Sequence, residues 1–92
     1  MDVNILDYGL NDKQGFIIYK ISGLSQKQLN FIDNNLEDET HVEDGELILK
    51  TLFEKEFFPF KSNESKIKND DFILREELEM NLFLSSFLED MV

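Results

Sequence analysis

The sequence predicts an α+β fold: a small single domain, residues 1–92, with an N-terminal β-hairpin and two to three helices packed on a short antiparallel sheet. Two patterns predict this class. β-Branched and aromatic residues fill positions 14–23 between turn residues, and a capped amphipathic helix pattern follows directly. A hydrophobic content of 41% that includes nine Phe supplies the apolar surface for one core.

The hairpin is predicted from two strand patterns and a turn. The segment QGFIIYKISG, residues 14–23, has the composition of a central strand, because β-branched and aromatic side chains are enriched in strands. VNILDY, residues 3–8, is a weaker strand pattern. Between them GLNDKQG, residues 9–15, supplies the Gly, Asn and Asp of a turn.

A helix is predicted from Ser25 to Leu36. Ser25 and Gln28 have the spacing of a capping box, in which each side chain bonds to the backbone N–H of the other residue. Leu29, Ile32 and Leu36 then recur at i, i+3 and i+7, so they share one face of the helix.

Residues 46–58 fit both a helix and a strand. Leu49, Leu52 and Phe53 form a helical stripe, whereas alternation from Leu47 to Leu49 and Phe53 suits a strand. The helix is preferred, and Pro59 sets its end near residue 58 because the residue before a proline avoids helical conformation. The polar residues 61–71 that follow predict a mobile connecting loop.

The C-terminal residues 72–92 also carry two periods. Apolar residues occupy all even positions from Phe72 to Leu84 except that of Glu76, as in a strand, yet a broad helical face is shared by Leu74, Leu78, Leu84, Leu88 and Met91. The run is too long for a typical strand and rich in strong helix formers. We therefore expect an extended segment at residues 72–74 and a helix from about Glu76 to Asp90.

The net charge of −11 argues strongly against unaided nucleic-acid binding, because a phosphate backbone requires a basic face. The absence of cysteine excludes disulfides, thiol nucleophiles and Cys-based metal sites. The N-terminal residues 1–10 lack the basic residue of a signal peptide, and no stretch approaches the roughly 18 apolar residues of a membrane span. These features predict a cytoplasmic protein, in the host cytoplasm if the gene is of phage origin, with no membrane partner.

The acidic stretch EDETHVEDGE, residues 37–46, does not match a metal site. If Gly45 took the sixth position of an EF-hand loop, Thr51 would stand at the twelfth, where a bidentate Glu is required. Zinc requires several His or Cys ligands, and His41 is the only histidine. The nucleotide-binding patterns GxGxxG and GxxxxGK[ST] are missing, and no nucleophile–base spacing points to catalysis. We expect a protein that is not an enzyme and uses no metal or cofactor.

The same stretch predicts a partner-binding surface of unneutralised carboxylates between two helices. Its acidic residues, with one that precedes it, are Asp33, Glu37, Asp38, Glu39, Glu43, Asp44 and Glu46. Such a run is usually a solvated surface, but it also steers basic partners. The basic surfaces that fit it best are the nucleic-acid grooves of repressors, enzymes and defence nucleases. An inhibitor that blocks such a groove acts as a DNA mimic, the strategy of phage-encoded anti-defence proteins and of immunity proteins that neutralise nuclease toxins.

The alternative is a structural or adaptor protein that associates through its C-terminal amphipathic helix. The apolar residues assigned to that contact are Leu84, Phe87, Leu88 and Met91. They would lie in a partner's groove or against a second copy in a homodimer. Packing of the same face on the strands, as part of the domain's own core, is the competing interpretation.

Overall fold

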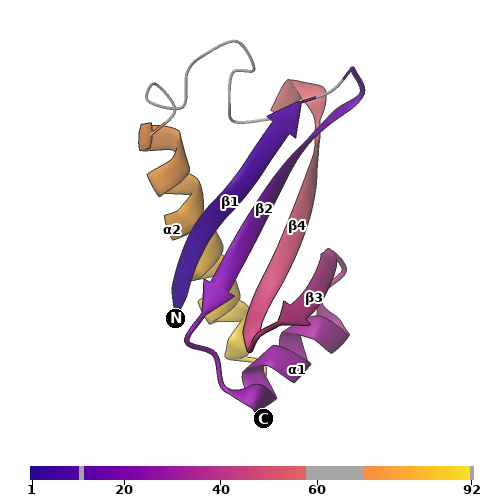
Figure 1. The fold of residues 1–92 in the computed structure, drawn as a ribbon. Helices are drawn as coiled ribbons and strands as arrows, with labels where there is room; N and C mark the ends of the chain where they lie inside the picture. Colours follow the sequence, from indigo (N-terminus) through magenta and orange to yellow (C-terminus); the bar gives the residue numbers. More distant parts are fainter. Residues whose placement is uncertain (11, 58–69, 92) are drawn as a thin grey trace.

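The computed structural model describes residues 1–10, 12–57 and 70–91. Its elements are β1 (Asp2–Leu10), β2 (Gln14–Ser22), α1 (Gln26–Asn35), β3 (Glu39–Glu43), β4 (Glu46–Glu54), the 3-10 turn η1 (Lys55–Phe57) and α2 (Asp70–Leu88). The strands form one antiparallel sheet in the order β1-β2-β4-β3, with α2 along one face and α1 at one end (Figure 1). The predicted α+β class and N-terminal hairpin are confirmed.

The β1–β2 hairpin follows the predicted strands. Pairing continues to Leu10 and Gly15, so the connection is shorter than the predicted turn at residues 9–15. The register shifts between Ile5 and Asp7, which leaves the extra residue Leu6 about half exposed, as expected at a β-bulge.

The predicted capping box is present at the start of α1. The Ser25 hydroxyl accepts from the backbone N–H of Gln28 at 3.2 Å, and the Gln28 side chain accepts from the backbone N–H of Ser25 at 2.8 Å. Leu29 and Ile32 are buried on the predicted face, and the helix is capped at Leu36. The helix prediction from Ser25 to Leu36 is therefore confirmed.

The helix predicted at residues 46–58 is wrong, because residues 46–54 form the central strand β4. Asp44 and Gly45 have positive φ angles of 53° and 78°, as a two-residue β-hairpin turn requires. This turn joins β3 to β4, and β2 pairs along the other edge of β4. Leu47 and Leu49 are buried, whereas Leu52 is 56% exposed, so the strand period prevailed over the helical stripe. The expected helix end at residue 58 lies outside the described residues.

The extended segment predicted at residues 72–74 is also wrong, because α2 is helical from Asp70 onward. The predicted helix from about Glu76 is confirmed and ends at Leu88. The even-numbered apolar residues are divided by the helical turn: Leu84 is buried, whereas Leu74, Leu78 and Leu82 are more than 60% exposed. Most of the predicted mobile loop at residues 61–71 lies outside the described residues.

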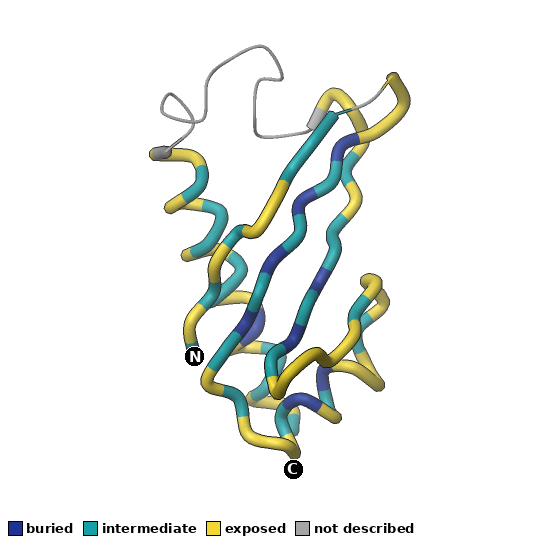
Figure 2. Tube along the Cα trace, in the orientation of Figure 1, coloured by how far each residue is buried: buried dark blue, intermediate teal, exposed yellow. Residues whose placement is uncertain are grey.

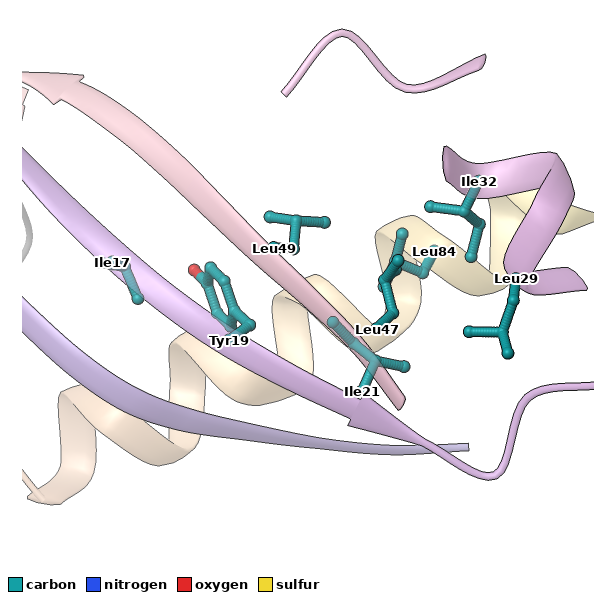
Figure 3. Packing of buried hydrophobic residues seen from close by; sticks show 8 residues of the cluster. All are labelled: Ile17, Tyr19, Ile21, Leu29, Ile32, Leu47, Leu49 and Leu84. Carbon is teal, nitrogen blue, oxygen red and sulfur yellow. The ribbon is translucent and has the colours of Figure 1, made fainter. Parts of the chain in front are cut away.

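The core lies between the sheet and the two helices. In Figure 2 the two central strands alternate between buried residues and partly covered ones, while β3 and its turn are mostly exposed. The buried side chains come from β2, β4, α1 and α2 (Figure 3): Ile17, Tyr19, Ile21, Leu29, Ile32, Leu47, Leu49 and Leu84. None of the helices in the described ranges is long and apolar enough to cross a membrane.

Candidate partner-binding surface

The acidic stretch forms a β-hairpin at the sheet edge, which corrects its expected position between two helices. Within the sheet β3 pairs with β4 only, so its other edge is the end of the sheet. The pairing places Glu39, His41 and Glu43 on the face opposite the helices, and Thr40 and Val42 on the helix side. Glu39, His41 and Glu43 are exposed.

The face opposite the helices, here called the open face, carries Glu39 and Glu43 of β3 and Glu46, the first residue of β4. Glu43 and Glu46 are directly opposite each other in the β3–β4 register. Lys20 of β2 lies 3.9 Å from the Glu46 carboxylate, so Glu46 is partly neutralised. Glu39 stands opposite Lys50. The open face is therefore acidic at β3 and mixed in charge toward the sheet centre.

The other predicted carboxylates lie elsewhere. Asp33 of α1 accepts a hydrogen bond of 2.7 Å from the Thr40 hydroxyl, which ties the helix to β3. Asp38 lies on the helix side, where the Thr51 hydroxyl donates to it at 3.4 Å. Glu37 and Asp44 are exposed beyond the two ends of β3. The seven carboxylates share one corner of the molecule but not one face.

A hollow of about 280 Å³ opens on the helix side, between β4 and α2. We call it the acidic hollow; its lining residues are Tyr19, Asp38, Thr51, Phe53, Glu76, Glu79, Met80 and Phe83. Asp38 brings the predicted acidic stretch to this site, and two glutamates of α2 join it. The hollow therefore combines carboxylates, two hydroxyls and aromatic walls.

The acidic surroundings alter two groups in this hollow. Burial, followed by the charges of Glu76 and Glu79, raises the pKa of Tyr19 far above its usual value, so its hydroxyl stays protonated. Burial also raises the pKa of Glu76, and the charge of Glu79 adds to the shift, while Arg75 opposes it. Arg75 pairs with Glu79 at 3.5 Å on the exposed side of the helix.

His41 has one exposed carboxylate neighbour on its own strand. Its Nε2 atom lies 3.3 Å from the Glu43 carboxylate, and both side chains are mostly exposed. Within residues 1–10, 12–57 and 70–91, no three His, Cys, Asp or Glu side chains are grouped so as to hold a metal ion.

The alternative apolar site is largely part of the domain's own packing. Leu84 is fully buried, and Phe87 and Leu88 pack against the core. Phe87 also contacts Phe31 of α1, with ring centroids 5.3 Å apart. Met91 is half-buried beyond the end of α2. The face that was assigned to a partner thus joins α2 to the sheet and to α1.

Sequence reasoning missed most of the acidic hollow. Glu76 and Glu79 lie 30 and 33 positions beyond Glu46, the last residue of the acidic stretch, and the sequence pattern identifies Tyr19 only as a strand residue. Spacing alone indicates that Glu76, Glu79 and Phe83 lie close together on a helix at i, i+3 and i+7. Only the packing of α2 on the sheet brings Asp38 to them.

Comparison with known proteins places the chain in a family but gives it no role. Residues 2–90 match the model of DUF5750, a family of unknown function, so the chain belongs to that family. No curated protein matches the sequence.

Proposed function

We propose that this chain, as a member of a family of unknown function, is a small non-enzymatic binding protein that occupies a basic surface of a larger protein. The observation that carries the proposal is the set of carboxylates at and just before β3. Asp38, just before β3, joins two glutamates of α2 in the acidic hollow, which has no basic residue among its lining residues, while the exposed carboxylates of β3 lie on the opposite face of the sheet.

Electrostatics favours this role over direct nucleic-acid binding. A net charge of −11 repels phosphate and attracts basic protein surfaces, and the attraction accelerates encounter at low salt. The largest basic surfaces in cells are nucleic-acid grooves. We therefore infer an inhibitor in the manner of a DNA mimic, with a cytoplasmic nucleic-acid-binding or defence enzyme as the partner.

The test is affinity capture from native lysate, followed by binding measurements with the purified partner. The variant Glu37→Lys/Glu43→Lys reverses one exposed carboxylate just before β3 and one at its end, and Glu56→Lys/Glu89→Lys makes the same charge change away from β3. We expect the first variant to lose the partner and the second to retain it. Duplex DNA should compete with the wild-type chain for the partner. Equal retention by the two variants would refute the acidic-surface proposal.

A second candidate function uses the outer face of α2. Leu74, Leu78 and Leu82 follow one another at i, i+4 and i+8 and are 65%, 61% and 62% exposed. The carboxylate of Asp71 belongs to the same helical face. Because two copies of so acidic a chain repel each other, the occupant that fits is a basic amphipathic helix of another protein.

Light scattering coupled to size-exclusion chromatography separates this candidate from the homodimer. We expect a monomer that binds a designed basic amphipathic helix, with binding lost in Leu78→Gln and kept in Ser86→Gln, an exposed α2 position. A concentration-dependent dimer that is disrupted by Leu78→Gln would show instead that a second copy covers the leucines.

A further inference from the structure

We propose that the acidic hollow receives the side chain of an arginine from the basic partner. This inference rests on the proposed function and adds the residue type by which the partner is recognised. Three independent features of the hollow lead to it: a buried hydroxyl without a partner, carboxylates from two directions, and aromatic walls.

The first feature is the Tyr19 hydroxyl. Tyr19 is 1% exposed and lines the hollow, and no described residue donates a hydrogen bond to its hydroxyl or accepts one from it. Figure 3 shows the hydroxyl on the side of the ring that points away from Leu47 and Ile21. A buried hydroxyl without a partner costs free energy, so a ligand that supplies a hydrogen bond at this point binds favourably.

The second feature is the placement of charge. Asp38 reaches the hollow from the connection before β3, while Glu76 and Glu79 reach it from successive turns of α2. Arg75 pairs with Glu79 at the exposed side, where an ion pair contributes little, and its charge also acts on Glu76. Arg75 itself does not line the hollow, and none of the lining residues is basic, so the three carboxylates favour a cation from outside the described chain.

The third feature selects among cations. Phe53, Phe83 and Met80 supply aromatic and apolar side chains to the lining of the hollow. A guanidinium group is planar, stacks on aromatic rings and offers five donors to several acceptors at once, whereas an ammonium is a compact, strongly hydrated charge. A volume of about 280 Å³ is below the range of pockets for drug-sized ligands and suits a single side chain.

The experiment titrates the wild-type chain with N-acetyl-arginine amide as the probe. Binding is measured from the changes in NMR chemical shifts. The lysine and citrulline amides serve as matched probes, since citrulline keeps the shape of arginine without its charge. We expect saturable shifts centred on Tyr19, Thr51 and Phe83, the tightest binding for arginine, and none for citrulline. Lysine binding as tight as arginine binding, or shifts spread evenly over all acidic surfaces, would overturn the proposal.

Single substitutions test whether residues of the hollow bind the arginine probe. Tyr19→Phe and Glu76→Gln should each weaken arginine binding about tenfold, the factor equivalent to one charge-assisted hydrogen bond. Glu43→Gln removes the same charge outside the hollow and should leave binding unchanged. Thermal unfolding of each variant confirms that the fold is intact. If Glu43→Gln weakened arginine binding as much as Glu76→Gln does, the effect would come from net charge alone, and the proposed site would be wrong.

The purified partner separates the two proposals. If Tyr19→Phe and Glu76→Gln bind the partner as tightly as wild type while Glu37→Lys/Glu43→Lys does not, the arginine site is wrong and the acidic-surface function stands. If arginine amide binds in the hollow but no basic partner depends on Glu37 and Glu43, the proposed function is wrong and the guanidinium site remains.

Discussion

At the scale of single residues, Tyr19 combines a core position with an unused polar group. Its ring belongs to the buried cluster of β2, where phenylalanine would fill the same space. Its hydroxyl adds no hydrogen bond to a described residue and lies among carboxylates. In the proposed arginine site this hydroxyl gains a hydrogen-bond partner, which is favourable because burial of an unpaired polar group costs free energy.

Tyr19→Phe should therefore bind arginine less well without loss of stability. We expect its free energy of unfolding at neutral pH to equal or exceed that of wild type by up to about 1 kcal/mol, because the unpaired hydroxyl is removed. Chemical denaturation measures the difference. A loss of more than about 1 kcal/mol would show that the hydroxyl has a structural hydrogen-bond partner.

The same substitution should change the alkaline pH dependence of stability. The pKa of Tyr19 is raised in the folded chain, so above pH about 10 the unfolded chain loses this proton first and wild-type stability falls as pH rises. The fall approaches about 1.4 kcal/mol per pH unit. We expect Tyr19→Phe to lack this contribution in denaturation series at increasing pH. Parallel curves for the two proteins would contradict the assignment.

Glu76→Gln should change the pH dependence of stability between acidic and neutral pH. The pKa of Glu76 is raised by burial and by Glu79, so the folded chain holds this proton more tightly than the unfolded chain does. Wild-type stability gains from this group as pH falls through its folded pKa and loses that gain as pH rises toward neutrality. We expect the Gln variant to be more stable at neutral pH, with the difference shrinking in acid. Melting curves across this range provide the measurement.

At the scale of elements, the β3–β4 hairpin determines where the charges go. Asp44 and Gly45 form its two-residue turn, and the strand alternation then sends Glu39 and Glu43 to the open face. Carboxylates on a short edge strand also discourage pairing with another chain. The Asp-Gly pair was a sequence signal for this hairpin that the helical stripe obscured.

Gly45→Ala tests this turn. With φ of 78°, a Cβ atom at this position is strained although nothing lies within 4 Å of it. We expect a loss of about 1 kcal/mol in the free energy of unfolding, because only the backbone conformation is affected. Gly45→Asn is the control and should lose less, since asparagine adopts positive φ more readily. Equal losses for the two variants would point to a cause other than backbone strain.

The helix α2 has two separate roles on two faces. Its inner face brings Leu84 to the core, while Glu77 accepts from the backbone N–H of Ile5 at 2.8 Å and covers the free edge of β1. Its outer face leaves Leu74 and Leu78 exposed. Alternation along the sequence could not separate these faces, because a period of 3.6 residues divides even-numbered positions between them.

At the scale of the whole molecule, the net charge of −11 opposes compaction. Salt should therefore stabilise the chain. We expect added NaCl to raise the unfolding temperature, with each 1 kcal/mol equivalent to about 4–8 °C for a domain of this size. The variant Glu37→Lys/Glu43→Lys should respond less. An unfolding temperature that does not change with salt would show that charge repulsion does not limit stability.

Local signals of the sequence were sufficient for much of this protein. The capping box fixed the start of α1 at Ser25, and β-branched and aromatic residues fixed β2, because these patterns depend on residues close in the chain. The strand and helix patterns together predicted the α+β class, which the sheet and its two helices confirm. The seven acidic residues were expected to act as one surface, whereas the structure divides them between the two faces of the sheet and α1.

Only the tertiary structure decided the remaining elements and the candidate site. Residues 46–54 became a strand because β2 and β3 pair with both of their edges, and such pairing depends on residues far away in the sequence. In the same way, packing of α2 on the sheet brought Glu76 and Glu79 to Asp38 and Tyr19. The sequence determined the charge and the local elements, whereas long-range contacts determined which charges meet.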